Sequence, residues 1–315
     1  MKLRSGSGPV DRDWFGLEAF LPGPRFTRDG GQLYLQDEVG STNDFLRGRG
    51  PDAVGRLCRW DGWGWVAQTR SRQAPVRELK PGTVVVARRQ TAGRGRQGRQ
   101  WVDCGGLHLS VSVPRHRAAF NRGFSVWLGL IVALVLREGE RVDARLKWPN
   151  DIVVDRRKLG GLLLERAGTG ESAQVVAGLG LNLSAGPHDM PWALRETATS
   201  LASEGGRVPR LGELCARLLS RVEAELDRFC DEGWAEYRPA LELLDSLLGQ
   251  RVRLVTRQGE IRGRAIGIDD QGALLVETQL DDGSKRVDAV RVGDVHLLPA
   301  ADEPREGGAD AGGDR

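Results

Sequence analysis

The chain is poor in cysteine and in long apolar runs, and both shortages exclude classes of protein. Its 315 residues contain 4 cysteines and no C-x-x-C pair, which argues against a disulfide framework. The longest uncharged apolar run, 126–136, has 11 residues. A membrane-spanning helix needs about 20. The N-terminal MKLRSGSGPVDRDW also lacks the apolar stretch of a secretory signal. We therefore expect a protein of the reducing cytoplasm that does not enter a membrane.

Lysine is scarce too, although basic residues are common. Only 5 of the 46 Lys and Arg residues are lysines, and the net charge is +3. So small a net charge gives little support to nucleic-acid binding. An ammonium is a compact charge that can lose its proton, whereas a guanidinium stays charged. Lys147 and Lys158 lie 11 positions apart in a segment with other unusual features. We favour a functional role for both over chance survival on the surface.

Hydrophobic patterning predicts an α+β chain. Alternating or apolar runs predict strands at 33–35, 82–87, 107–113, 152–154, 161–165 and 174–181, with a hairpin turn at 167–170. Helical spacing predicts a buried helix over 125–138 and amphipathic helices over 211–230 and 234–247. Ser41 or Thr42 is expected to cap a short helix over 44–46.

Changes in composition predict four segments. Residues 1–35 are expected to be an irregular extension, and 36–248 a larger domain that contains the helices. Short strands divided by Gly- and Asp-rich turns predict a small β-barrel over 249–299. Residues 300–315 are expected to be a solvated tail. The Arg-, Gly- and Trp-rich stretch 48–80 has the character of an insertion that can hold a hairpin.

The segment 93–101, GRGRQGRQW, has the composition of an anion-binding loop. Its glycines allow close backbone approach to a ligand, and Arg94, Arg96 and Arg99 can fork onto phosphate oxygens. The letters also fit G-x-G-x-x-G, but a strand pattern follows and no acidic residue stands about 20 positions on, which excludes a dinucleotide fold. Crowded cations repel one another, so we expect a mobile loop that an anion orders. A solvated basic loop without function is the alternative.

Three further segments place polar groups near strand ends. Lys147-Trp148-Pro149-Asn150-Asp151 precedes the strand at 152–154, where its side chains can converge on a pocket. The alternative is that Asn150 and Asp151 bond their own backbone in a turn. Lys158 lies beside Gly160-Gly161, and the glycines of 178–182 leave room for a flat ligand, although glycine in a strand more often marks tight packing. No histidine or cysteine spacing suits a metal, so no metal is expected to be fixed by the protein alone.

Taken in order, these segments resemble the biotin protein ligases. The match consists of Ser41-Thr42-Asn43, the loop 93–101, the motif 147–151, Lys158-Leu159-Gly160-Gly161 and Gly178-Leu179-Gly180-Leu181-Asn182. A small C-terminal barrel also lies where that family carries one, and the resemblance covers about 36–299. It implies a mixed central β-sheet flanked by helices, the class II synthetase-like biotin/lipoate ligase fold, followed by an SH3-like barrel.

The resemblance also implies a reaction in two steps. Biotin and ATP form biotinyl-5′-AMP and pyrophosphate, with Mg²⁺ accompanying the ATP. A lysine of a biotin carboxyl carrier protein, from acetyl-CoA carboxylase or a related carboxylase, then takes the biotinyl group. Some family members carry an N-terminal DNA-binding domain, for which residues 1–35 are too short, so no operator binding is expected. A homodimer through a sheet edge is a further possibility.

Site residues follow from the resemblance position by position. Those implied for biotin are Ser41, Thr42, Asn43, Gln90, Gly93, Arg94, Gly95, Arg96, Trp101, Lys158 and Gly161. Those implied for ATP are Arg96, Arg99, Lys147, Asn150, Asp151 and Asn182. The expected catalytic set is Lys158, Arg94, Arg96 and Asp151, with Asp151 also receiving the incoming lysine. Lys158 is expected on the charge that develops between the biotin carboxylate and the α-phosphate.

Three other interpretations stay open at this point. A lipoate or octanoate ligase shares the sheet and the adenylate chemistry, but it gives no reason for Ser41-Thr42-Asn43. A nucleic-acid binder that uses the arginine loop predicts steep salt dependence and a strongly basic domain. A pure interaction module leaves Lys147 to Asp151 unexplained.

Overall fold

The computed structural model describes residues 13–27, 32–113, 123–169, 173–280 and 282–298. The chain divides into two compact units, Met1–Ser246 with Asp270–Gly272, and Leu247–Asp269 with Ala273–Arg315. The expected tail at 300–315, residues 1–12 and the end of the turn at 167–170 lie outside the described residues. In the described part, no helix is both long and apolar enough to cross a membrane.

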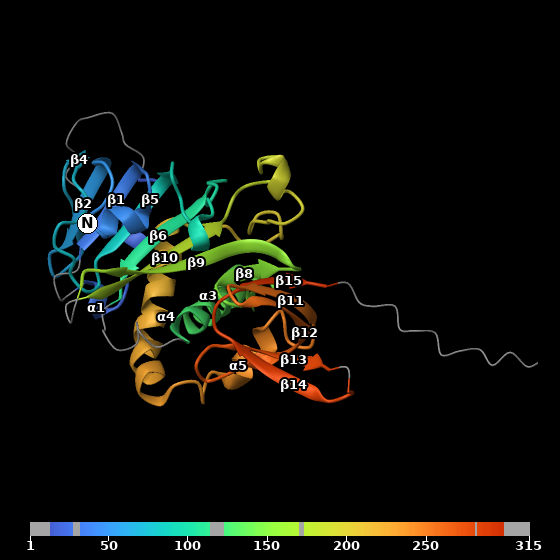
Figure 1. Ribbon diagram of the computed structural model, residues 1–315. Helices are drawn as coiled ribbons and strands as arrows, with labels where there is room; N and C mark the ends of the chain where they lie inside the picture. The colour runs from blue at the N-terminus through green and yellow to red at the C-terminus, as the bar shows by residue number, and fades with distance from the viewer. Residues whose placement is uncertain (1–12, 28–31, 114–122, 170–172, 281, 299–315) are drawn as a thin grey trace, which may run out of the picture. The chain divides into compact units, whose positions relative to one another are not determined.

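The first unit is built on a ten-stranded sheet (Figure 1). Its strands are β1 (Gln32–Val39), β2 (Ala53–Trp60), β3 (Trp65–Ala67), β4 (Ser71–Gln73), β5 (Val84–Gln90), β6 (Gly106–Ser112), β7 (Arg145–Lys147), β8 (Asp151–Val154), β9 (Arg157–Ala167) and β10 (Gln174–Asn182). They lie in the order β3-β2-β1-β5-β6-β10-β9-β8-β7, and β4 pairs with β2. The β1–β5 pair is parallel, whereas β5 pairs antiparallel with β6. The predicted mixed sheet is confirmed.

The stretch 48–80 extends this sheet. It contributes β2, which pairs with β1, and the short strands β3 and β4, which both pair with β2. The hairpin that its composition allowed is β2–β3, and Asp61 closes its turn by accepting from the backbone N–H of Trp63 and Gly64. The stretch therefore forms one edge of the main sheet.

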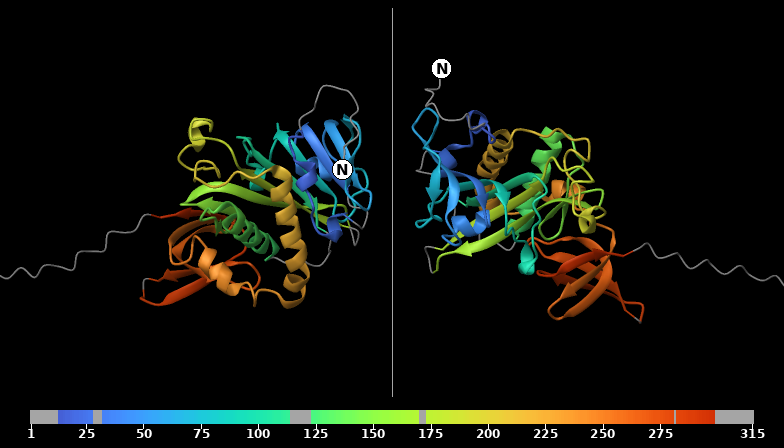
Figure 2. Two further views of the ribbon diagram at one scale, coloured as in Figure 1. Left: turned by 180° about the vertical axis from the view of Figure 1, so that it is seen from behind. Right: turned by 90° about the horizontal axis from the view of Figure 1, so that it is seen from above.

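Helices cover one face of the sheet (Figure 2, left). α3 (Phe124–Glu140) contacts α4 (Leu211–Glu232) and the strands β7, β8 and β9, and α5 (Arg238–Leu244) contacts α3. Trp127 of α3 stacks on Phe229 of α4 with ring centroids 4.7 Å apart, and both side chains are fully buried. α5 is shorter than the predicted helix over 234–247 at both ends, because residues 234–237 form a turn and the helix ends at Leu244, before a second turn at 246–249.

Strand alternation decides what the opposite face carries. Leu109 of β6 and Leu179 of β10 line an apolar cluster together with Leu128 of α3 and Leu218 of α4. Their neighbours along the strands point the other way, because successive side chains in a strand alternate between faces. His108, Ser110, Gly178 and Gly180 therefore lie on the face that α2 (Thr42–Leu46) contacts.

The N-terminal segment takes part in the core. Residues 13–27 hold a 3₁₀ helix, Leu17–Ala19, and the helix α1, Pro24–Thr27. Phe15, Phe20 and Phe26 are at most 1% exposed, and the Trp65 indole donates to the carbonyl of Phe20 at 2.8 Å. An irregular extension was expected over 1–35. The part of it that the structure describes is packed by these three rings, which are too sparse to show helical or strand periodicity in the sequence.

The second unit is all-β. Its strands are β11 (Arg251–Thr256), β12 (Gly259–Ile268), β13 (Leu274–Gln279), β14 (Lys285–Val290) and β15 (Asp294–Leu297). They form an antiparallel sheet in the order β14-β13-β12-β11-β15. Pairings within the described residues leave β14 and β15 as the two ends of this sheet. The structure therefore supports an all-β domain, without the closure that a barrel requires.

Candidate active site

The first turn of α2 anchors a buried polar network. Ser41 takes the N-cap position, and its carbonyl accepts from the N–H of Phe45, but its side chain makes no capping bond. Thr42 instead donates twice to the side-chain oxygen of Gln90, from its backbone N–H at 2.8 Å and from its hydroxyl at 3.1 Å. The end of β5 is thus tied to the start of α2 through one amide.

Asn43 continues the network toward β9. Its Oδ1 lies 2.6 Å from the hydroxyl of Ser110, which is also 2.7 Å from the Thr42 hydroxyl. Its Nδ2 donates to the Glu165 carboxylate at 2.8 Å and to the carbonyl of Leu163 at 3.2 Å. Asn43 is 3% exposed, so these bonds satisfy a side chain that water does not reach. Thr42, Asn43 and Gln90, predicted separately from the sequence, lie together.

Glycines of β10 form the floor beneath this network. A Cβ on Gly178 would lie 2.3 Å from Oδ1 of Asn43, and one on Gly180 would lie 2.7 Å from the indole of Trp101. A side chain at either position would displace a predicted site residue. Tight packing against Asn43 and Trp101 therefore explains both glycines, and the room that they leave is filled by these two side chains.

The loop 93–101 folds back on itself. Trp101 donates its backbone N–H to the carbonyl of Gly93 at 2.9 Å, and Gly95 donates to the carbonyl of Arg99 at 2.7 Å. A short 3₁₀ helix, Arg96–Gly98, forms its tip. Gly93, the first residue of the loop, is buried, and a Cβ there would lie 2.8 Å from the carbonyl oxygen of Trp101.

Arginines of this loop have partners in the protein. The guanidinium of Arg94 lies 2.6 Å from the Asp44 carboxylate and 3.1 Å from that of Glu165, which also pairs with Arg47. Arg96 donates to Oδ1 of Asn150 at 3.2 Å. Arg99 is exposed. Mutual repulsion was the expected reason for a mobile loop, but for Arg94 two carboxylates compensate that repulsion.

Lys158 and Asp151 form an ion pair on neighbouring strands. The ammonium lies 2.7 Å from the carboxylate and 5.7 Å from the centre of the Trp101 ring. A Cβ on Gly161 would lie 3.2 Å from the ammonium nitrogen and 3.3 Å from the carboxylate, so this glycine gives the pair its space. The backbone of Lys158 is bonded on both sides, because its N–H donates to the carbonyl of Thr197 and its carbonyl accepts from the N–H of Thr199.

Lys147 lies directly across from Asp151 in the β7–β8 pair. Burial lowers the pKa of the Lys147 ammonium, the charge of Asp151 opposes that change, and the charge of Lys158 adds to it. The two lysines and Asp151 therefore form one cluster of coupled charges. Of the predicted catalytic residues, the structure brings Lys158 and Asp151 together at the start of β9 and β8, and Lys147, predicted for ATP, lies beside them.

Both asparagines predicted for ATP donate to backbone carbonyls of other segments. Asn150 donates to the carbonyl of Leu162 at 2.6 Å, and Asn182 donates to the carbonyl of Thr199 at 3.0 Å. Both are buried. Because Asn150 bonds a neighbouring strand, the alternative of a turn that bonds its own backbone is wrong for this side chain.

The sequence does not by itself predict several residues of this site. Asp103 and His108 lie behind Gln90, Ser110 joins Thr42 to Asn43, and Asp44 and Glu165 hold Arg94. Burial would raise the pKa of Asp103, but the contact with His108, the positive charge that this histidine carries when it is protonated, and the backbone N–H groups of Gly105 and Gln90 lower it to about 2. The alternation of His108 and Ser110 with the leucines of β6 was the available signal, since it places two polar groups on one buried face.

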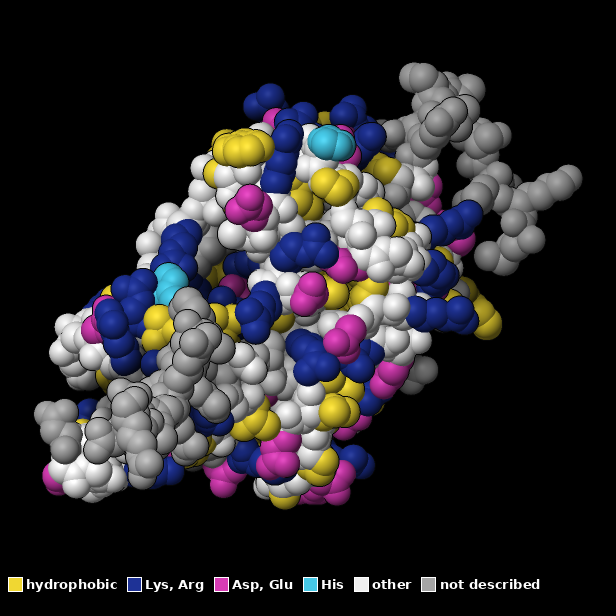
Figure 3. Space-filling model, turned by 90° about the vertical axis from the view of Figure 1, so that its right-hand side faces the viewer, with side chains coloured by type: hydrophobic (Ala, Val, Ile, Leu, Met, Phe, Trp, Pro, Cys, Tyr) yellow, Lys and Arg dark blue, Asp and Glu magenta, His cyan; other side chains and the backbone are white. Residues whose placement is uncertain are grey.

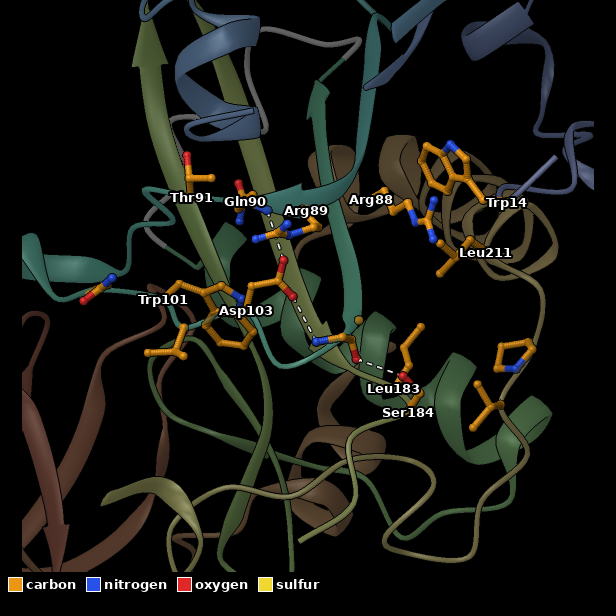
Figure 4. A pocket seen from close by; sticks show the side chains of 16 residues that line it. Trp14, Arg88, Arg89, Gln90, Thr91, Trp101, Asp103, Leu183, Ser184 and Leu211 are labelled. Carbon is orange, nitrogen blue, oxygen red and sulfur yellow. Dashed lines mark hydrogen bonds between the residues drawn. The ribbon is translucent and has the colours of Figure 1, made fainter. Parts of the chain in front are cut away.

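A cavity of about 760 Å³ opens beside this network (Figure 4). Gln90, Trp101 and Asp103 line it on one side, and Trp14 and Leu211 line it on another. In the part of the chain that the structure describes, no three His, Cys, Asp or Glu side chains gather as a metal site would require. On the face in Figure 3, Lys and Arg are interspersed with Asp and Glu.

Family models match both parts of the chain. The biotin/lipoate A/B protein ligase family matches residues 65–182, and the biotin protein ligase C-terminal domain matches 247–289. The biotin–[acetyl-CoA-carboxylase] ligase of Paracoccus denitrificans is 35% identical over 226 residues, which cover 67% of this chain and 92% of that protein. The bifunctional ligase/repressor BirA of Escherichia coli is 33% identical over 260 residues, 79% of this chain and 70% of that protein. This chain spans about two thirds of the length of the ligase/repressors that it matches.

Solved structures give the same result. The biotin protein ligase from Aquifex aeolicus in complex with biotin and ATP superposes with a TM-score of 0.64 at 25% identity. The match covers 84% of this chain and 98% of the other.

Proposed function

The chain belongs to the biotin protein ligase family, and from this membership we propose that it uses ATP to attach biotin to a lysine of a carrier protein. In the first step, an oxygen of the biotin carboxylate attacks the α-phosphorus of ATP, the bond to the β-phosphate breaks, and biotinyl-5′-AMP and pyrophosphate form. In the second step, the ε-amine of the acceptor lysine attacks the biotinyl carbonyl, AMP leaves, and the amine loses a proton. The acceptor is the biotin carboxyl carrier protein of acetyl-CoA carboxylase or a related carboxylase.

The single observation that carries this proposal is the placement of Lys158. Both substrates of the first step are anions, so a cation that screens the carboxylate and the α-phosphate lowers the barrier. The ammonium of Lys158 lies 2.7 Å from the Asp151 carboxylate and 5.7 Å from the centre of the Trp101 ring. Asp151 holds the charge in place, and the ammonium has only to exchange this partner for the substrate anions. Lys147 adds a second positive charge beside the same carboxylate.

Biotin occupies the part of the site formed by α2, β5 and the glycine loop. Ser41, Thr42, Asn43 and Gln90 supply donors and acceptors for its ureido ring, and Gly93 and Gly95 allow the loop backbone to approach it. Trp101 covers the apolar chain, which ends near Lys158 and Gly161. Arg94 is bound to Asp44 and Glu165 in the structure, so we assign it to securing the loop against α2 and β9. Arg96 is the loop cation that turns to the carboxylate and phosphate.

ATP enters on the side of β8 and β9. The residues assigned to it are Arg96, Arg99, Lys147, Asn150, Asp151 and Asn182. Mg²⁺ arrives bound to the triphosphate and is part of the substrate, where it screens phosphate charge. Asp151 has a second task, because the acceptor lysine, with a reference pKa of about 10.4, arrives mostly protonated. Equal slowing of the two steps by Asp151→Ala would remove that separate role.

Biotin-dependent exchange of labelled pyrophosphate into ATP tests the first step directly. We expect exchange with biotin and none with lipoate or octanoate, and we expect Lys158→Ala to abolish it while the variant keeps its melting temperature. Exchange with lipoate or octanoate alone would show that the substrate is one of these acids, and the fold assignment would be unchanged. No exchange with any of the three acids would refute the adenylation chemistry.

The remaining assignments are part of the same proposal. The catalytic domain spans 36–248, an SH3-like domain spans 249–299, and the chain acts in the cytoplasm without binding operator DNA. A mobility-shift assay tests DNA binding. The sedimentation coefficient tests whether the chain forms a homodimer. Steep salt-dependent binding of nucleic acid would favour the non-enzymatic alternative.

A further inference from the structure

We infer that Asp103 and His108 form a positioning pair that fixes the orientation of the Gln90 amide, and through it the part of the site that binds biotin. The inference rests on the proposed function. Neither residue belongs to the set that the family resemblance implied. His108 lies beneath the site, because it is 1% exposed and faces the side chain of Gln90, whereas Asp103 is part of the cavity wall.

The pair contacts Gln90 from two directions. Nδ1 of His108 lies 3.3 Å from Nε2 of Gln90, and Nε2 of His108 lies 3.0 Å from Oδ1 of Asp103. Oδ2 of Asp103 accepts the backbone N–H of Gln90 at 3.0 Å, and Oδ1 accepts the N–H of Gly105 at 2.9 Å. The carboxylate thus binds the main chain of Gln90 directly (Figure 4). It reaches the side chain of Gln90 through the imidazole of His108.

Donor and acceptor roles fix the direction of each hydrogen bond from Thr42 through the Gln90 amide and His108 to Asp103. The backbone N–H of Thr42 can only donate, so the group of the Gln90 amide that faces it is the oxygen. The NH₂ of Gln90 then faces Nδ1 of His108, which must accept. The imidazole proton therefore sits on Nε2, where a carboxylate oxygen that can only accept lies 3.0 Å away, although the N–H does not point directly at it. Every group has its required role when His108 is neutral and protonated at Nε2.

The opposite tautomer breaks the arrangement at Thr42. A proton on Nδ1 would point at the NH₂ of Gln90, and the amide would have to turn over to offer its oxygen. Its NH₂ would then face the N–H of Thr42, so this bond would be lost, and the Thr42 hydroxyl would have to accept instead of donate. The lost hydrogen bonding weakens the first turn of α2, which we assign to biotin, and does not affect the positions of Lys147 and Lys158. The pair is thus a determinant of biotin affinity rather than of ATP affinity.

Asp103→Asn tests this reasoning with almost no change in shape. With its NH₂ in the place of Oδ1, the Asn amide donates to Nε2 of His108 and favours the wrong tautomer, and it gives up the bond from the Gly105 N–H, while its oxygen still accepts the N–H of Gln90. We expect the KM for biotin in pyrophosphate exchange to rise about tenfold, the effect of about one lost hydrogen bond, while kcat and the KM for ATP stay within about twofold. Asp143→Asn is the matched control, because Asp143 also has a lowered pKa but pairs with Arg137 and Arg145. An equal rise in both KM values, or none, would overturn the inference.

Two variants of His108 separate positioning from packing. His108→Asn keeps an acceptor at the place of Nδ1, so the KM for biotin should stay within about threefold of the wild type. His108→Phe removes the acceptor and keeps the bulk, so its KM should rise as it does in Asp103→Asn. Equal effects of the Asn and Phe variants would show that His108 only fills space.

The tautomer itself is measured without activity. In protein labelled with ¹⁵N-histidine, we expect His108, assigned by its loss in His108→Asn, to be protonated at Nε2 in the wild type and at Nδ1 in Asp103→Asn. Protonation at Nδ1 in the wild type would overturn the inference even if biotin-dependent exchange is normal. If exchange is absent and the tautomer changes as expected, the proposed function fails and the positioning pair stands.

Discussion

The substitution Gly178→Ala examines the contact between β10 and the buried asparagine of the site. The new Cβ would lie 2.3 Å from Oδ1 of Asn43 and 2.9 Å from its Cγ. An exposed side chain would swing away, but Asn43 is 3% exposed and bonded to Ser110, Glu165 and the carbonyl of Leu163. Its amide therefore has to move by roughly 1 Å to reach ordinary van der Waals distance, against the bonds that hold it.

The cost of this movement can be set from the contacts. Overpacking of a well-packed site costs about 1–3 kcal/mol, and each of the strained hydrogen bonds contributes about 1 kcal/mol. We expect the free energy of unfolding to fall by about 2 kcal/mol. We also expect the KM for biotin to rise roughly 10- to 30-fold, because about 1.4 kcal/mol corresponds to a tenfold change.

Urea unfolding and biotin-dependent pyrophosphate exchange measure the two effects. Gly64→Ala is the control, because a Cβ at this position in the β2–β3 turn meets nothing within 4 Å. It should change the free energy of unfolding by less than about 0.5 kcal/mol and leave the KM for biotin unaltered. A normal KM for biotin in Gly178→Ala would refute the assignment of Asn43 to the biotin site. Equal losses in both variants would show that the effect comes from glycine's backbone and not from the contact.

Two further predictions follow from the charged groups. The pKa of Asp103, about 2, is below the ordinary value, so its charged form stabilises the fold above about pH 4 and this contribution is lost as the pH falls toward 2. In Asp103→Asn, the free energy of unfolding measured in urea should change less between about pH 4 and pH 2, by at most about 2 kcal/mol. The same pH dependence in the variant and the wild type would contradict the pairing with His108. Asp151→Asn removes the charge that opposes the lowering of the Lys147 pKa by burial and by Lys158. The pKa of Lys147 should fall further, so the alkaline rise in the KM for ATP should begin at lower pH. Asp143→Asn should not change the pH at which the KM for ATP rises. If Asp151→Asn does not change it either, Lys147 does not contribute to ATP binding.

Local sequence determined much of this protein. Period-two alternation located the central strands, and helical spacing located α3 and α4, because both signals are written in neighbouring residues. The motif residues were also found from local sequence, by their residue types and spacing. Lys147, Asp151 and Lys158 stand in one stretch of chain, and the short β7–β8–β9 connections bring them together. The order of the motifs was sufficient to indicate the family.

Only the tertiary structure decided which groups meet across the sheet. Asp44 and Glu165 are 50 and 71 positions from Arg94, and no local pattern shows that two carboxylates hold this cation. The same holds for Gln90, which depends on Thr42 on one side and on His108 on the other. Phe15, Phe20 and Phe26 enter the core without any periodicity. Periodicity records which face of its own element a residue occupies, whereas the partner on that face is set by strand order and register.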